Sequence, residues 1–158
     1  MAEFADSHDQ LMLAAMAEAA KAERLGDVPI GCVIARDGEI IAATHNRRVI
    51  DADPTAHAEM LAIRAAAEAI GDWRLTGCTL AVTLEPCAMC AGAIVLARID
   101  RVIYGATDPK GGAVDTLYEI CTDRRLNHTA EVVGHVRAEQ CGEMLTAFFR
   151  KQRAMGKK

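Results

Sequence analysis

The chain has 158 residues, of which 51% are hydrophobic and 25% are charged, and its formal net charge is −4. This length suits one domain with a sizeable core, so we expect residues 1–158 to form a single domain. No apolar run approaches the roughly 20 residues of a membrane span, and the net charge argues against a protein that coats nucleic acid generally. The acidic segment 1–6 lacks the features of a signal peptide, so we expect a cytoplasmic protein without membrane association.

The first predicted elements follow from capping and turn signals. Ser7 and Gln10 match a capping box, which predicts a helix over 8–25 that ends at Gly26. Asp37-Gly38 is typical of a hairpin turn. The two strands that this turn joins are predicted over 29–35 and 39–43.

The later elements alternate between helices and strands. A polar loop is predicted over 45–53, helices over 57–69, 87–97, 115–121 and 138–153, and strands over 79–83, 101–105 and 131–136. Strands separated by helices, after one hairpin, indicate an α/β layered sheet with crossover connections.

The end of the last helix, about 148–158, is basic. Five cationic residues occur there with no acidic residue among them: Arg150, Lys151, Arg153, Lys157 and Lys158. Cations stabilise a helix C-terminus, and a basic cluster also suits RNA phosphates. Both interpretations remain open from the sequence.

Two thiols and one imidazole have the spacing of a metal site. Cys87 and Cys90 lie three residues apart at the start of a predicted helix, which places both sulfurs on one face. The pair alone also suits a redox-active disulfide or half of a four-cysteine structural site. No second such pair exists, however, and a redox pair has no need of His57-Ala58-Glu59 at the head of another helix. The combination is the known signature of zinc-dependent nucleobase deaminases, so we predict one Zn²⁺ per subunit on His57, Cys87 and Cys90.

Glu59 is the candidate catalytic residue. Three protein ligands leave one tetrahedral position for water, which zinc makes acidic, with a pKa of about 7. Glu59 would accept a proton from that water and deliver protons to the ring nitrogen and the departing amine. Ideal helical geometry separates residues i and i+2 by about 200°. The prediction therefore requires that the helix end departs from that geometry, so that both side chains reach one cleft.

The four other cysteines lie in or beside apolar segments. We interpret Cys32, Cys78, Cys121 and Cys141 as buried core thiols, because a reducing cytoplasm makes disulfides rare.

Longer blocks of sequence narrow the choice among the zinc-dependent deaminases. They are Val28-Pro29-Ile30-Gly31, His45-Asn46-Arg47, the stretch 53–59, the stretch 82–93, Asp108-Pro109-Lys110-Gly111-Gly112, Asn127-His128 and Phe148-Phe149-Arg150. On these residues, the chain from Val28 to Arg153 resembles the bacterial tRNA-specific adenosine deaminases. The resemblance implies a three-layer α/β/α sandwich with a central mixed five-stranded sheet, as in cytidine deaminase, and a homodimer. It also implies conversion of adenosine to inosine, with release of ammonia, at the wobble position of an arginine tRNA anticodon stem-loop.

The same resemblance implies the residues that bind substrate: Asn46, Ala58, Asp108, Lys110, Phe149 and Arg150. Asn46 would hold the target base, for which its amide offers a donor and an acceptor, although by itself it is typical of a turn after a strand. Aromatic and Arg side chains stack on splayed RNA bases. By themselves Phe148 and Phe149 suit the core side of a helix, and we expect one of them to be buried. Asp115 departs from the small Gly- or Ser-rich turn that is common in the family.

Two other functions remain open from the sequence. A deaminase of a free base or nucleoside, such as guanine, cytosine or cytidine, needs the same zinc chemistry, and the basic C-terminal helix favours RNA over these. A non-catalytic, zinc-stabilised RNA-binding module is the third possibility, but a structural site would not require Glu59.

Overall fold

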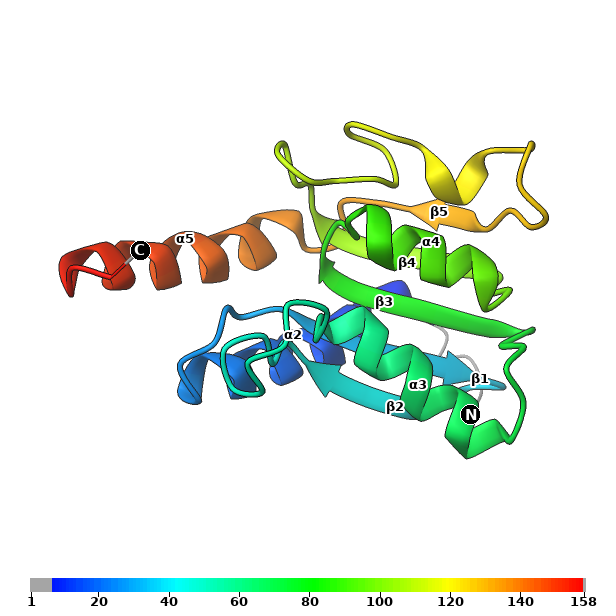
Figure 1. Ribbon diagram of the computed structural model, residues 1–158, viewed down its shortest axis with the longest axis horizontal. Helices are drawn as coiled ribbons and strands as arrows, with labels where there is room; N and C mark the ends of the chain where they lie inside the picture. The colour runs from blue at the N-terminus through cyan, green and yellow to red at the C-terminus, as the bar shows by residue number, and fades with distance from the viewer. Residues whose placement is uncertain (1–6, 158) are drawn as a thin grey trace.

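A five-stranded mixed sheet with strand order β2-β1-β3-β4-β5 organises the computed structural model, which describes residues 7–157 (Figure 1). The strands are β1 (Gly31–Arg36), β2 (Glu39–His45), β3 (Cys78–Leu84), β4 (Arg101–Ala106) and β5 (Glu131–Val133). β1 pairs antiparallel with both β2 and β3, whereas β3, β4 and β5 pair parallel. The predicted mixed sheet is therefore confirmed.

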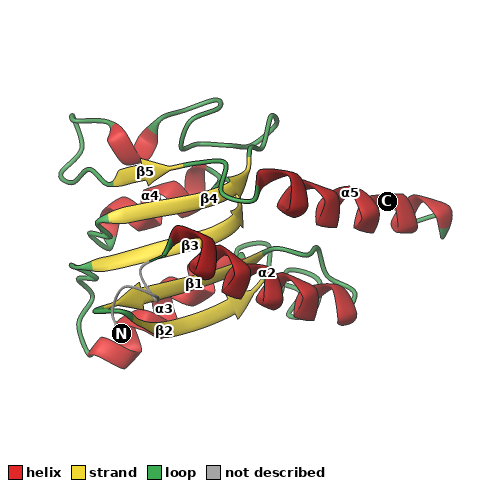
Figure 2. Ribbon diagram, turned by 180° about the vertical axis from the view of Figure 1, so that it is seen from behind, coloured by secondary structure: helices red, strands yellow, loops and turns green. Residues whose placement is uncertain are grey.

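Helices cover both faces of this sheet and make a three-layer arrangement. They are α2 (His8–Arg24), α3 (Ala58–Ile70), α4 (Ala88–Leu96) and α5 (Ala138–Ala154), with a short 3₁₀ helix, η1 (Ile120–Thr122). α3 and α4 lie on the face seen in Figure 1, and α2 and the start of α5 lie on the face seen in Figure 2. Alternate strand residues fill the two cores: Ile34 and Leu80 pack with α3 and α4, whereas Val33 and Ala81 pack with α2.

The predicted element ends are confirmed where local chemistry determines them. The Ser7 hydroxyl accepts a hydrogen bond from the Gln10 N–H at 3.4 Å, as an N-cap does. Asp37 and Gly38 both have positive φ, at 51° and 78°, which a tight two-residue hairpin turn requires. Gly71 ends α3 in the left-handed conformation, with its N–H donating to the Ala67 carbonyl at 2.8 Å.

The helix predicted over 115–121 is wrong, because only η1 forms there. The Leu117 N–H donates to Gly112 and the Ile120 N–H to Ala113, which are five and seven residues back rather than four. The chain therefore makes a wide turn instead of a helical ladder. β5 is also shorter than predicted and ends at Val133, since His135 and Arg137 have positive φ.

The remaining sequence predictions concern the four other cysteines, membrane association and the two ends of the chain. The thiols of Cys32, Cys78, Cys121 and Cys141 are buried and free, as expected. Within residues 7–157, every helix is too short or too polar to cross a membrane. The acidic segment 1–6 and Lys158 of the basic end lie outside the described residues.

Candidate metal centre and active site

Two helix starts bring the predicted metal ligands together. His57 is the N-cap of α3 and Cys87 is the N-cap of α4, and both have extended backbones with ψ of 149° and 178°. An N-cap lies outside the regular helix, which removes the geometric conflict between His57 and Glu59. The Thr44 hydroxyl donates to the Ala58 carbonyl at 2.7 Å and ties the end of β2 to the start of α3.

The three ligand atoms have the spacing of a tetrahedral zinc site. His57 Nδ1 lies 3.6 Å from Cys87 Sγ and 3.6 Å from Cys90 Sγ. Tetrahedral zinc binds nitrogen at about 2.0–2.1 Å and sulfur at 2.3 Å, which places such atoms about 3.6 Å apart. Within residues 7–157 this is the one group of three or more potential ligands close enough to share an ion. The residues present therefore fit zinc, with Nδ1 as the histidine ligand.

The electrostatics of the thiols favour a cation at this point. A hydrogen bond from Cys90, with a second contact from His57, lowers the pKa of Cys87 to about 3. The same contact raises the pKa of Cys90, and the contact with Cys87 raises the pKa of His57. These contacts favour the thiolate form of one cysteine, and binding of a metal releases the proton of the other thiol.

Glu59 is a buried carboxyl group beside these ligands. Only 4% of the residue is exposed, and it lies in the first turn of α3. Burial raises the pKa of Glu59 to about 7, and the partly compensating interactions with its own backbone and with His57 lower it less. A carboxyl group with a pKa near neutrality can both accept and donate a proton under physiological conditions.

These residues open onto a cavity of about 600 Å³, within the size range of small-molecule sites. It is bounded by the starts of α3 and α4, by the loop after β4 and by α5. Six of the predicted site residues line it together with His57 and Cys87: Asn46, Ala58, Glu59, Asp108, Lys110 and Phe149. Cys90 is fully buried and does not line the cavity. Arg150 is exposed on α5 and does not line the cavity.

Asn46 is a buried residue rather than an exposed turn residue. It is 1% exposed, and its amide nitrogen donates to Asp27 Oδ1 at 3.0 Å. Its Oδ1 is buried and has no hydrogen-bond partner within residues 7–157. An unpaired buried acceptor is unusual in a folded protein, and here it belongs to a side chain that lines the cavity.

Glu85 organises the loop beside the cavity and was not predicted as a site residue. Its Oε2 accepts from the N–H groups of Val114, Asp115 and Thr116 at 3.2, 2.8 and 2.9 Å. Its Oε1 accepts from the Asp108 N–H at 3.1 Å and from the Thr116 hydroxyl. The only sequence signal was its place immediately before Pro86 and Cys87.

Asp108 and Asp115 both use their carboxylates within the protein. Asp108 Oδ1 accepts from the N–H groups of Lys110 and Gly111 at 3.0 and 3.2 Å, so it shapes the loop. Asp115 accepts from the Tyr104 hydroxyl at 2.6 Å. The acidic departure from the family pattern is therefore paired with a core tyrosine.

Comparison with known proteins agrees with this geometry. Residues 5–106 match the family model for the cytidine and deoxycytidylate deaminase zinc-binding region. The match includes His57, Glu59, Cys87 and Cys90. The chain thus holds the zinc-binding His/Cys/Cys site that is typical of this family.

Similar proteins narrow the family further. The chain is 55% identical over 148 residues to the tRNA-specific adenosine deaminase of Bacillus subtilis, which covers 93% of this chain and 92% of that one. A solved structure from work on adenosine-to-inosine editing by wobble-position tRNA deaminases is 45% identical, with a TM-score of 0.82, and covers 85% of this chain and 98% of that one. The guanine deaminase of Bacillus subtilis is 34% identical, with a TM-score of 0.62, and covers 70% of this chain and 82% of that one. With its sheet order and its metal centre, the chain therefore belongs to the tRNA-specific adenosine deaminases, within the cytidine and deoxycytidylate deaminase family.

Proposed function

We propose that this protein is a zinc-dependent hydrolase that converts adenosine to inosine at the wobble position of a tRNA anticodon, with arginine tRNA as the substrate. The observation that carries the proposal is the buried Glu59 carboxyl group next to the His57, Cys87 and Cys90 cluster, in a cavity of about 600 Å³. Relatives with 45–55% identity are tRNA-specific adenosine deaminases, which favours a polynucleotide over a free base.

In the proposed reaction Glu59 moves the protons. Zinc on the three ligands supplies a Lewis acid that makes a water molecule nucleophilic. Glu59 takes a proton from the attacking water and delivers it to the ring nitrogen beside the reacting carbon. Glu59 then takes the second proton of that water, from the hydroxyl group now on the carbon, and passes it to the departing amine. The C–N bond breaks as the carbonyl of inosine forms, so that water and adenosine give inosine and ammonia. The pKa of Glu59 near 7 suits both transfers.

The proposed substrate contacts divide between cavity and rim. Asn46 and Ala58 lie where a flipped base would enter, next to Glu59. Asp108, Lys110 and Phe149 also line the cavity, and the exposed ring of Phe149 would stack on a neighbouring base. Arg150 is exposed further along α5 and would contact phosphates of the anticodon stem-loop.

We further propose that residues 1–158 act as one catalytic domain and that the enzyme is a cytoplasmic homodimer. The cytoplasmic assignment is supported by free buried thiols, which suit a reducing compartment. The dimer follows from the family resemblance, and sedimentation of the zinc-loaded protein tests it.

The function is tested with an arginine anticodon stem-loop and the zinc-loaded protein, scoring inosine by nucleoside analysis. We expect inosine at the wobble position and none in a matched stem-loop that carries guanosine there. Guanine, cytosine and cytidine are tested alongside, because a guanine deaminase is also a relative. Efficient turnover of a free base with an unchanged stem-loop would overturn the proposal. Binding of the stem-loop without any turnover would support a non-catalytic RNA-binding module instead.

A further inference from the structure

Asp27 carries a buried carboxylate that the proposed chemistry does not use. It follows the end of α2, where Gly26 has a φ of 83° and the Asp27 N–H donates to the Ala22 carbonyl at 2.9 Å. This turn places Asp27 inside the protein with 0% of its surface exposed. A buried carboxylate is costly unless its oxygens are paired, so its partners indicate its role.

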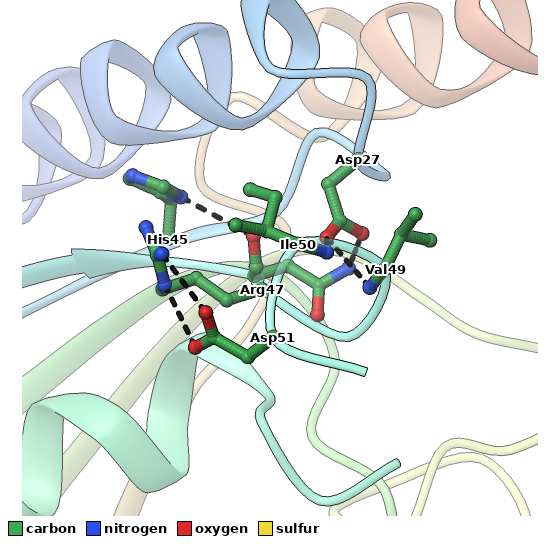
Figure 3. Close-up of polar contacts among 7 residues, drawn as sticks. Asp27, His45, Arg47, Val49, Ile50 and Asp51 are labelled. Carbon is green, nitrogen blue, oxygen red and sulfur yellow. Dashed lines mark hydrogen bonds and ion pairs between the residues drawn. The ribbon is translucent and has the colours of Figure 1, made fainter. Parts of the chain in front are cut away.

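The two carboxylate oxygens of Asp27 accept hydrogen bonds from two different parts of the chain. Oδ2 accepts from the N–H groups of Val49 and Ile50 at 2.9 and 3.2 Å, in the loop that follows β2 (Figure 3). Oδ1 accepts from the Val28 N–H at 2.9 Å and from the Asn46 side-chain nitrogen at 3.0 Å. One carboxylate therefore joins the loop around Val49 to the amide that lines the cavity.

The contact with Asp27 determines which atom of the Asn46 amide stays free. The amide nitrogen has two acceptors, Asp27 Oδ1 at 3.0 Å and the Val28 carbonyl at 3.4 Å, and an amide has two N–H groups to donate. Its Oδ1 is the atom without a partner among the described residues. If the amide were rotated by 180°, its oxygen would face a carboxylate oxygen, and two acceptors repel each other.

An unpaired buried acceptor destabilises a folded protein, and a ligand donor would remove that cost. We propose that Asp27 is a positioning residue of this enzyme: it orients the Asn46 amide so that Oδ1 receives a hydrogen-bond donor of the bound nucleotide. The inference rests on the proposed function, because it takes the cavity to hold the target nucleotide.

Asp27→Asn tests the orientation with almost no change of shape. The introduced amide can accept from Val49 with its oxygen and donate to Asn46 with its nitrogen, at the cost of the bond from the Val28 N–H. Because this donor would otherwise face the Asn46 nitrogen, the Asn46 amide turns over and gives up its longer contact with the Val28 carbonyl, at 3.4 Å. The cavity then presents a donor where it presented an acceptor. We expect kcat/KM on the stem-loop to fall at least about tenfold, the scale of one lost hydrogen bond, with zinc content unchanged.

Exchanging the two residues supplies the decisive comparison. Asn46→Asp alone places two carboxylates in contact and is expected to be poorly active. In the double variant Asp27→Asn/Asn46→Asp, the amide now at position 27 donates to the carboxylate now at position 46, whose other oxygen again faces the cavity. We expect kcat/KM at least about tenfold above that of Asp27→Asn, because contacting residues are not additive. A double variant no better than the single ones overturns the proposal. If the Asp27→Asn variant does not fold, the double variant must restore both folding and turnover. A double variant that folds but has no turnover also overturns the positioning role of Asp27.

Asp51→Asn is the matched control. Asp51 lies in the same loop as Val49, and its exposed carboxylate accepts two hydrogen bonds from Arg47, each of 2.9 Å (Figure 3). The same chemical change there breaks an exposed ion pair, which contributes little. We expect kcat/KM within about twofold of the wild type, and a fall equal to that of Asp27→Asn would assign the effect to the loop rather than to Asn46.

A second measurement separates this inference from the proposed function. If the wild type leaves the stem-loop unchanged, the proposed function fails, but the orientation of Asn46 can still be measured by hydrogen exchange of its side-chain amide in NMR. We expect protected Asn46 protons in the wild type and rapidly exchanging protons in Asp27→Asn, where they face the cavity. Equal exchange in the two proteins overturns the positioning role.

Discussion

The rings of Phe148 and Phe149 meet edge to face with their centroids 5.4 Å apart, yet the two side chains lie in different surroundings. Phe148 is 6% exposed and belongs to the buried residues of α5. Phe149 is 42% exposed and lines the cavity. Consecutive residues of a helix differ by about 100° in direction, so one ring supports α5 while the other remains available to a ligand.

Truncation of these two rings is expected to separate stability from binding. Phe148→Ala should lower the free energy of unfolding by about 3–5 kcal/mol, as loss of a core aromatic does. Phe149→Ala should change stability by less than about 1 kcal/mol and weaken stem-loop binding by about 1–3 kcal/mol, because a stacking surface is lost. Urea denaturation and fluorescence anisotropy measure the two quantities. Unchanged affinity in Phe149→Ala would remove this residue from the substrate site.

Glu59→Gln is expected to keep the metal and lose the reaction. The amide has the shape of the carboxyl group but cannot carry the proton, so we expect kcat to fall at least about 10²–10⁴-fold, with one zinc still bound. Glu68→Gln, an exposed residue of the same helix, should behave as the wild type. Turnover that survives in Glu59→Gln would contradict the proton-transfer mechanism.

Removal of zinc is expected to abolish activity and to lower the melting temperature, because a ligand that binds only the folded protein stabilises it. Added zinc should restore both properties. Elemental analysis of Cys90→Ser should show less than one zinc per chain, whereas Cys78→Ala, at the far end of β3, should retain one. Full zinc content in Cys90→Ser would mean that the ligand set is wrong.

Glu85→Gln is expected to lower the free energy of unfolding by about 1–3 kcal/mol at neutral pH, since one amide N–H then faces N–H donors. Burial by itself raises the pKa of Glu85, but hydrogen bonds from Thr116, Asp115 and Asp108 outweigh it, so that the pKa lies below its usual 4.5. A lowered folded-state pKa stabilises the protein above pH 4.5, and this stabilisation disappears as the pH falls through the folded-state value. The difference between wild type and variant in urea denaturation should therefore shrink in acid. A constant difference would contradict the role of the carboxylate.

Gly31→Ala is expected to be strongly destabilising. A Cβ at Gly31 would overlap the Ala15 carbonyl and come within 2.5 Å of the Ala19 nitrogen, so α2 would have to move away from β1. We expect a loss of about 1–3 kcal/mol or more by calorimetry. Gly142→Ala in α5, whose Cβ would meet only the Ala106 Cβ at 3.9 Å, should be neutral or up to about 1 kcal/mol more stable. Equal stabilities of the two variants would contradict the close packing of α2 on β1.

The sequence predicted most elements correctly because local chemistry determines their ends. Ser7 caps α2, Asp37 and Gly38 form the hairpin turn, and Gly71 ends α3. The zinc cluster followed from spacing, since Cys87 and Cys90 are separated by one helical turn. His57 needed the known signature in addition, because a single histidine carries no such information.

The prediction failed where distant residues decide the backbone conformation. The segment 115–121 has helix-compatible residues, but its hydrogen bonds run to Gly112, Ala113 and Glu85. Asp27 resembled an ordinary residue after a helix-ending glycine, and its burial depends on Asn46 and Val49, which come about twenty residues later. Such contacts between distant segments have no local pattern by which one sequence alone could reveal them.

The hydrogen bonds of Glu85 have a consequence for the divergence of this fold. Four of its five donors are backbone N–H groups, from Asp108, Val114, Asp115 and Thr116. A loop held through its backbone keeps its path when exposed side chains such as Pro109 and Lys110 change. Mutations can therefore alter what the rim of the cavity presents to a substrate while the neighbouring metal ligands stay in place. A loop that is fixed through its backbone in this way allows related enzymes to acquire new substrates by single substitutions, each of which the fold tolerates.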